Sequence, residues 1–232
     1  MSFSCAPEEI EKFNALADNW WNPHGEMKPL HQLNPVRFEY IQKFTSLSGK
    51  KILDVGCGGG ILTESLAKAG AQATGIDMSE KLIQVAAHHA KQNHLAIEYC
   101  MLPVEILAQE KPASFDIITC MELLEHVPDP FAIIKACQQL VKENGLIFFS
   151  TLNRTLKSFL IAIVGAEYVL NYLPKGTHEY AKFIRPSELH NLAEKAGLTF
   201  VNLQGMSYRP LSGEFYLSSK VDVNYLMCFR HE

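Results

Sequence analysis

The chain has 232 residues, of which 47% are hydrophobic and 20% are charged, and its formal net charge is −4. This is the composition of a globular domain and excludes a largely disordered chain. A net negative charge also argues against a general nucleic-acid binder, whose domain is usually basic.

The six cysteines are widely spaced: Cys5, Cys57, Cys100, Cys120, Cys137 and Cys228. None of them forms the CxxC pair of a zinc ribbon or a thioredoxin-type motif. This usage predicts reduced thiols and a cytoplasmic setting. The first residues lack the basic and apolar regions of a signal peptide, and no apolar run reaches the about 18 residues that span a bilayer.

The first 46 residues are expected to form an N-terminal helical segment. Acids in the first turn and apolar residues at helical spacing predict a helix over 7–19. Three prolines and one glycine over 22–35 indicate a structured loop, and a second helix is expected over 35–46.

Short apolar runs then alternate with helical patterns. We expect strands over 51–55, 73–77, 97–102, 115–121, 146–152, 198–204 and 222–230, and helices over 61–69, 80–92, 130–142 and 186–195. This alternation predicts an α/β fold with a doubly wound, mostly parallel seven-stranded sheet whose last strand is antiparallel. Residues 153–182 interrupt the alternation, and the whole chain, 1–232, is expected to form a single domain.

The strongest motif lies where the first expected strand turns into a helix, and residues 52–62 read ILDVGCGGGIL. Glycines there, including Gly56 and Gly58, allow positive φ angles and a close approach of the backbone to a ligand. Asp77 ends the next expected strand, where a carboxylate can accept hydrogen bonds from ribose hydroxyls. The motif therefore predicts a nucleoside-binding site.

Two features of the motif argue against a dinucleotide. The third glycine of a GxGxxG fingerprint would fall at position 61, which is Ile61. Asp54 precedes the glycines, and a carboxylate repels a pyrophosphate but attracts a cationic amino group. S-adenosylmethionine carries such a group and has no phosphate.

The motif resembles motif I of class I S-adenosylmethionine-dependent methyltransferases, which have a Rossmann-like fold. Further segments resemble the UbiG family of ubiquinone-biosynthesis O-methyltransferases: NWW at 19–21, KPLH at 28–31, LNPVR at 33–37, CMELLEHVPDP at 120–130, STLNR at 150–154, PKGTH at 174–178 and VDVNY at 221–225. The N-terminal segments and the KGTH segment are the specific ones. The resemblance covers nearly the whole chain.

This resemblance implies S-adenosylmethionine as cofactor, with contacts at Arg37, Gly56, Asp77 and Met121. Arg37 is suited to hold the methionine carboxylate by a bidentate pair. Met121, at the end of the fourth expected strand, is placed to pack near the adenosine or the sulfonium.

Glu122, Glu125 and His126 follow that strand at positions i, i+3 and i+4, which face one side of a helical turn. Two carboxylates and an imidazole suit a divalent cation, and the resemblance suggests Mg²⁺, as described for eukaryotic relatives. Alternatively, the histidine acts as a base or orients the loop, or the cluster is structural. A metal ion lowers the pKa of a bound hydroxyl, whereas a histidine takes its proton, so either would activate a phenol.

Residues 153–182 are unusually apolar and are flanked by basic residues. This insertion is interpreted either as a buried lid over the active site or as an interfacial helix on an anionic membrane surface. Both readings suit a substrate with a long isoprenoid tail. The expected location is therefore the cytoplasm, in peripheral association with the inner membrane.

The resemblance implies O-methylation of polyprenyl catechol or phenol intermediates, in both O-methylation steps of ubiquinone biosynthesis. Other enzymes of that pathway are possible partners, and no nucleic acid is expected. The alternatives are a methyltransferase of another small phenol, an NAD-dependent oxidoreductase, and a non-catalytic protein that binds a nucleoside or a lipid.

Overall fold

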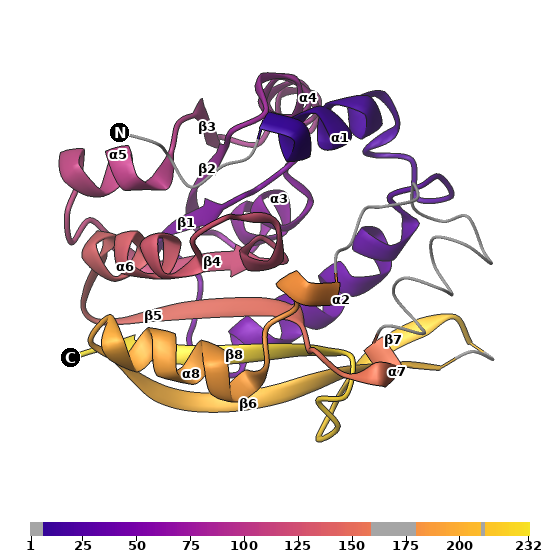
Figure 1. The fold of residues 1–232 in the computed structure, drawn as a ribbon. Coiled ribbons are helices and arrows are strands. Elements are labelled where there is room, and N and C mark those ends of the chain that lie inside the picture. The colour runs from indigo at the N-terminus through magenta and orange to yellow at the C-terminus, as the bar shows by residue number, and fades with distance from the viewer. Residues whose placement is uncertain (1–6, 159–179, 210–211) are drawn as a thin grey trace.

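A single eight-stranded sheet organises residues 7–158, 180–209 and 212–232, the part of the chain that the computed structural model describes (Figure 1). Its strands are β1 (Lys51–Val55), β2 (Gln72–Asp77), β3 (Glu98–Met101), β4 (Phe115–Met121), β5 (Val141–Leu152), β6 (Leu198–Arg209), β7 (Glu214–Ser218) and β8 (Asn224–His231). They are ordered β3-β2-β1-β4-β5-β8-β6-β7. The five strands β3-β2-β1-β4-β5 pair in parallel with their neighbours in this order. Strand β8 runs antiparallel to both β5 and β6.

The helices are α1 (Pro7–Leu16), α2 (Lys28–Gln42), α3 (Ile61–Lys68), α4 (Glu80–Gln92), α5 (Val104–Glu110), α6 (Pro130–Leu140), α7 (Leu156–Ser158) and α8 (Pro186–Lys195). Three short 3₁₀ turns complete the described elements: η1 (Ala17–Asn19), η2 (Leu124–His126) and η4 (Tyr180–Lys182). None of the helices described is long and apolar enough to cross a membrane.

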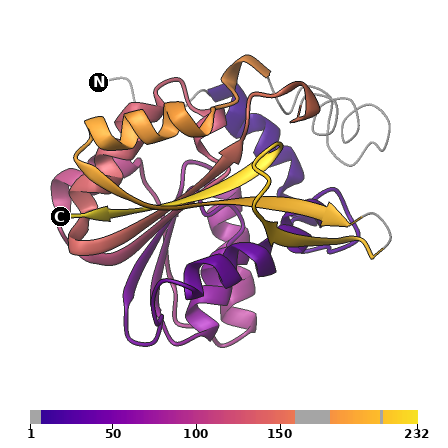
Figure 2. The same cartoon turned by 90° about the horizontal axis from the view of Figure 1, so that it is seen from below.

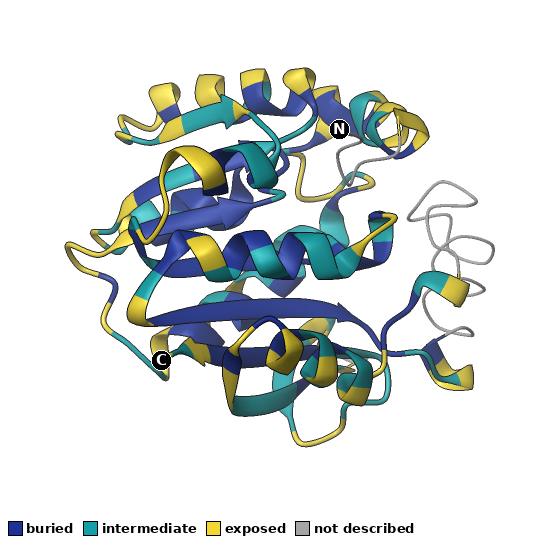
Figure 3. Ribbon diagram, turned by 60° about the vertical axis from the view of Figure 1, so that its left-hand side comes forward, coloured by how far each residue is buried: buried dark blue, intermediate teal, exposed yellow. Residues whose placement is uncertain are grey.

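Helices cover both faces of the sheet, as the view from below shows (Figure 2). Helices α5, α6 and α8 form one core with one face of the central strands, and α2 and α3 form a second core on the other face. The central strands β1, β4 and β5 are buried along most of their length, while the helices are buried on their inner side and exposed outward (Figure 3). Burial on both faces explains why β4 and residues 146–152 of β5 read as nearly continuous apolar runs.

The mostly parallel, doubly wound sheet expected from the alternation is confirmed, but it has eight strands and not seven. The additional strand is β7, which forms an antiparallel hairpin with β6 at the edge of the sheet. Its side chains are half-buried or exposed, so it lacks the apolar run that marks the inner strands. Helix α5 was missed as well, because it is only seven residues long and follows Pro103.

The prediction of a loop over 22–35 is wrong, because α2 already begins at Lys28. Pro29 occupies the first helical turn, where a missing N–H loses no helical bond. Pro35 lies inside the helix, where proline is normally disfavoured. Burial of Leu33, Tyr40 and other residues of α2 against the sheet outweighs this local preference.

The carboxyl ends of β1, β2 and β4 meet at one edge, and α1 and the start of α2 lie beyond that edge (Figure 1). The N-terminal helical segment therefore contributes to the same region as the glycine loop. Of the insertion expected at 153–182, residues 159–179 lie outside the described residues, and the KGTH segment lies among them.

Replacing Gly205 of β6 by alanine should destabilise the sheet edge that carries the β6–β7 hairpin. An added Cβ would lie 1.7 Å from the backbone oxygen of Lys220, and a backbone atom cannot move aside cheaply. We expect a loss of about 1–3 kcal/mol in the free energy of unfolding, measured by urea denaturation. The control is Thr199→Ala on the exposed part of β6, which should change it by less than about 0.5 kcal/mol. Equal stability of the two variants would contradict this packing.

Candidate active site

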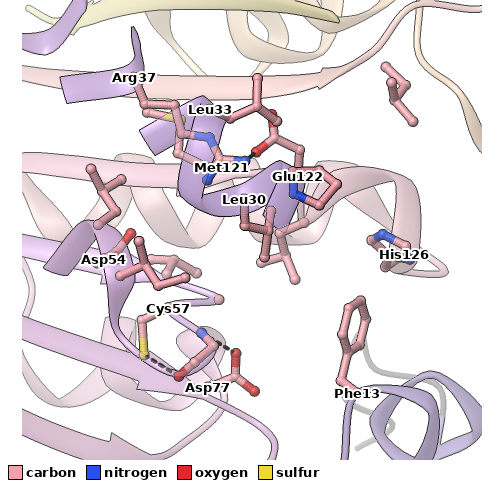
Figure 4. A pocket seen from close by; sticks show the side chains of 18 of the residues that line it. Phe13, Leu30, Leu33, Arg37, Asp54, Cys57, Asp77, Met121, Glu122 and His126 are labelled. Carbon is pink, nitrogen blue, oxygen red and sulfur yellow. Dashed lines mark hydrogen bonds and ion pairs between the residues drawn. The ribbon is translucent and has the colours of Figure 1, made fainter. Parts of the chain in front are cut away.

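A cavity of about 1070 Å³ opens at the carboxyl edge of the sheet (Figure 4). It runs from the glycine loop after β1, past the end of β4, to the β6–β7 hairpin. Ligand pockets usually measure about 300–1,000 Å³, so this volume is at the upper end of that range. The cavity therefore has room for a nucleoside-sized ligand and a second molecule.

The glycine loop is fixed by hydrogen bonds to the end of β2. The amides of Gly56 and Cys57 donate to the carbonyl of Ile76 at 2.9 and 3.0 Å, and the amide of Gly58 donates to Oδ2 of Asp77 at 2.9 Å. Gly56 and Gly58 have φ angles of 69° and 53°, which side-chain-bearing residues rarely adopt. The loop thus needs its glycines for its backbone conformation and not only for space.

Asp77 stands at the end of β2, as the sequence indicated, and lines the cavity. Its Oδ1 accepts a hydrogen bond from the amide of Ser79 at 2.8 Å, while Oδ2 holds Gly58. Burial raises the pKa of Asp77, and these amide hydrogen bonds counteract part of that effect. A carboxylate has about four acceptor positions, so this anchored group can still accept hydrogen bonds from a ligand.

Asp54 is only 2% exposed and is already paired inside the protein. Its Oδ1 accepts a hydrogen bond from the hydroxyl of Thr119 at 2.7 Å, and its Oδ2 accepts one from the hydroxyl of Thr63 at 2.6 Å. Burial raises the pKa of Asp54 to about 6, and the two hydroxyls oppose this shift. The group lines the cavity as a buried source of negative potential.

Arg37 and Glu122 form a buried ion pair beside Met121 (Figure 4). Burial lowers the pKa of Arg37 to about 10, and its Nε has no hydrogen-bond partner among the residues described. Glu122 also accepts a hydrogen bond from the hydroxyl of Ser150 at 2.7 Å. Arg37, Met121 and Glu122, all predicted from the sequence, line the cavity. The guanidinium of Arg37 is already paired with the carboxylate of Glu122.

Glu122, Glu125 and His126 do not share one side of a helical turn. Glu122 has a positive φ of 46° and precedes the 3₁₀ turn η2, which contains only Glu125 and His126 of the three. Glu125 is buried away from the cavity, where it accepts a hydrogen bond from the hydroxyl of Thr151 at 2.8 Å. Its other oxygen has no hydrogen-bond partner within the described ranges.

The donor set does not fit a metal ion in this arrangement. Glu122 is paired with Arg37, Glu125 with Thr151, and His126 with Glu9. Across residues 7–158, 180–209 and 212–232, no three His, Cys, Asp or Glu side chains are grouped so that they could hold a metal ion.

Glu9 is a residue of this site that the sequence did not reveal. It lies on α1 and accepts a hydrogen bond at Oε2 from Nδ1 of His126, with 3.0 Å between the two atoms. Phe13, one helical turn later, places its ring edge-on against the imidazole at 5.2 Å between centroids. The only sequence signal was the i, i+4 spacing of an acid and an aromatic residue, which is equally typical of any amphipathic helix.

Trp20 was also missed as a site residue. Its indole covers the glycine loop so closely that a Cβ on Gly58 would lie 2.5 Å from the ring. Its Nε1 is buried and has no hydrogen-bond partner in the described part of the chain. Trp21 adds a hydrogen bond from its own Nε1 to the carbonyl of Gly59 at 2.9 Å.

The far wall of the cavity comes from the β6–β7 hairpin. It is lined by Met206, Ser207, Tyr208, Phe215 and Tyr216. Gln32 of α2 donates a hydrogen bond to the carbonyl of Gly213 at 2.8 Å and so ties this hairpin to the N-terminal segment. This end of the cavity is aromatic and apolar, whereas the end at the glycine loop is charged.

Comparisons with known proteins agree with this architecture. A family model described as "Methyltransferase domain" matches residues 30–203. A ubiquinone biosynthesis O-methyltransferase of Coxiella burnetii (strain RSA 493 / Nine Mile phase I) is 59% identical over 225 residues, which is 97% of this chain and 96% of that protein. One of Methylococcus capsulatus is 54% identical over 222 residues, covering 96% and 94%.

Solved structures resemble the fold at low sequence identity. The magnesium protoporphyrin IX methyltransferase of Synechocystis PCC 6803, solved with bound SAH, has a TM-score of 0.71 at 18% identity, covering 96% of this chain and 98% of its own. A [4+2]-cyclase has a TM-score of 0.61 at 16% identity, covering 84% and 79%. At these identities the likeness concerns the fold alone.

Asp54→Asn should change how the stability of the ligand-free protein depends on pH. Because burial raises the pKa of Asp54 from 3.8 to about 6, the folded chain retains a proton there that the unfolded chain has released. The contribution of Asp54 to the free energy of unfolding therefore falls as the pH rises from 3.8 to about 6. Urea unfolding from about pH 5 to about pH 7.5 should show a smaller decline for the variant than for the wild type. Parallel pH profiles would show that Asp54 titrates normally.

Proposed function

The chain belongs to the ubiquinone biosynthesis O-methyltransferases, and from that membership we propose its reaction and substrate class. It transfers a methyl group from S-adenosylmethionine to a phenolic hydroxyl of polyprenylated quinone precursors, in both O-methylation steps of ubiquinone biosynthesis. The observation that carries this proposal is the continuous cavity, which joins a nucleoside-type glycine loop to an aromatic and apolar wall.

The charged end of the cavity fits the cofactor. Asp77 accepts hydrogen bonds from the ribose hydroxyls, and Gly56 and Gly58 give the loop the backbone conformation that holds it against Asp77. Arg37 binds the methionine carboxylate, while Met121 packs beside the sulfonium. One guanidinium nitrogen of Arg37 is paired with Glu122, so this role requires Glu122 to share the guanidinium or turn away from it.

The other end of the cavity fits the acceptor. Tyr208, Phe215 and Tyr216 offer aromatic surface for the ring and the first part of an isoprenoid tail. S-adenosylmethionine supplies an electrophilic methyl group on a sulfonium. The protein must place the acceptor oxygen in line with that group and remove the proton of a phenol, whose pKa is about 10.

His126 is the residue best placed to accept that proton. It lines the cavity, and histidine is the commonest general base near neutral pH. As the oxygen–carbon bond forms and the carbon–sulfur bond breaks, the hydroxyl proton passes to the imidazole. Glu122 and Glu125 then act on the site through Arg37 and Thr151, respectively.

Peripheral association with the inner membrane through the insertion at 153–182 is part of the proposal, because the substrate tail resides in the bilayer. Two exposed apolar side chains flank the part of this insertion outside the described residues, Leu156 at 72% and Tyr180 at 36% exposure. The nearby Arg154 and Lys157 form ion pairs with Glu188 and Asp222. Other enzymes of the pathway are candidate partners at the same surface.

Asp77→Ala should weaken S-adenosylmethionine binding by about 1–3 kcal/mol, the scale of hydrogen bonds to a charged group. The variant removes the ribose acceptor and also releases the amide of Gly58. Isothermal titration calorimetry measures the affinity, with Glu143→Ala as a control because Glu143 is an exposed acid outside the cavity. Unchanged affinity of the Asp77 variant would overturn the ribose assignment.

The proposed reaction is tested by following methyl transfer from S-adenosylmethionine to a prenylated catechol. Wild-type protein should turn over equally with and without a chelator, and His126→Ala should lower kcat by about 100-fold or more while cofactor affinity is kept. If chelation abolishes turnover and Mg²⁺ restores it, a metal activates the hydroxyl and the base role fails. If the wild type transfers no methyl group to any phenol, the enzymatic proposal fails as a whole.

A further inference from the structure

We infer that Glu9 is a positioning residue that holds the imidazole of His126 with its proton on Nδ1, so that Nε2 is the nitrogen that accepts the substrate proton. This inference rests on the proposed function, because it assigns the acid partner of the proposed base. The partner comes from the N-terminal helix α1, far from His126 in the sequence.

The hydrogen bond itself fixes the tautomer. Nδ1 of His126 lies 3.0 Å from Oε2 of Glu9, and an ionised carboxylate can only accept a hydrogen bond. The other oxygen of the same carboxylate is paired with Nζ of Lys12, and a neighbouring ammonium group favours the ionised form. The proton must therefore reside on Nδ1, and a neutral imidazole then has its acceptor at Nε2.

The carboxylate is held from more than one direction, which makes it a rigid partner. Its Oε1 binds Nζ of Lys12 at 2.9 Å, and Nζ of Lys182 lies 3.9 Å from the same atom. Glu9 is 7% exposed although it lies on the first helix described. Phe13, on the same helix, packs its ring edge-on against the imidazole of His126 and so restrains its rotation.

Helix α1 connects this pair to the cofactor end. The side-chain oxygen of Asn14 accepts a hydrogen bond from the hydroxyl of Ser79 at 2.6 Å, and the amide of Ser79 donates to Asp77. Glu9 and Asn14 thus attach α1 to the sheet edge at two points, one at the proposed base and one beside the ribose acid. The base is oriented only while α1 is docked over the cavity.

The test compares Glu9→Ala, Glu9→Gln and the control Glu8→Gln, since Glu8 is the exposed neighbour on α1. Glu9→Ala should lower kcat by about 10- to 100-fold, the usual effect of losing a partner that orients a functional histidine. The KM of the catechol and the Kd of S-adenosylmethionine should stay within about twofold. Glu9→Gln should recover part of kcat because its amide oxygen still accepts from Nδ1, and Glu8→Gln should match the wild type.

Two further readouts separate positioning from folding. Nitrogen-15 NMR of the imidazole should show the proton on Nδ1 in the wild type and loss of that single tautomer in Glu9→Ala. If Glu9→Ala instead weakens cofactor binding as strongly as it lowers kcat, the residue only docks α1 and the inference is overturned. A wild-type spectrum with the proton on Nε2 would overturn it as well.

Failure of this inference is distinguishable from failure of the proposed base. If His126→Ala is slow while Glu9→Ala keeps the wild-type kcat, His126 acts without Glu9 and only the positioning role is lost. If His126→Ala itself turns over at the wild-type rate, the proposed base role fails, whatever the Glu9 variants do.

Discussion

The hydrogen bond from the amide of Gly58 to Asp77 is the interaction on which the site depends. It joins the loop after β1 to the end of β2, two strands that pair in parallel, and so fixes the loop relative to the sheet. Gly58 combines a positive φ with the amide that donates to Asp77, and the ring of Trp20 packs against the same glycine. The loop and the N-terminal segment therefore meet at a position where a side chain would not fit.

Charge at the carboxyl edge is unevenly distributed. Arg37 is buried and paired with Glu122, and the charges of Asp54 and Glu125 also act on it, while Asp77 lies at the end of β2 on the same edge. Such an excess of carboxylate disfavours a pyrophosphate and favours a ligand with a positive sulfonium and amino group. The same burial raises the pKa values of Asp54 and Asp77 and lowers that of Arg37, so desolvation opposes the charged form of each of these groups.

The sequence predicted those parts of the molecule that are encoded locally. The glycine loop and Asp77 are local signals in a strand–turn–helix context, and β1, β4 and residues 146–152 of β5 are marked by buried apolar runs. Glu9, Trp20 and the β6–β7 hairpin reach the cavity only through tertiary packing, so no local pattern marks them. The expected grouping of Glu122, Glu125 and His126 assumed a regular helical turn, whereas the positive φ of Glu122 separates their side chains.

Helix α1 joins the residue that we propose as the base to the loop beside the acid that we propose to bind the ribose. Its contacts to Ser79 and to His126 lie at opposite ends of one short rigid element, so docking of the helix establishes both or neither. Helix α1 also lines the cavity itself through Glu9 and Phe13. The N-terminal segment, which lies outside the parallel sheet, therefore contributes to the wall of the cavity just as the strands that position the glycine loop do.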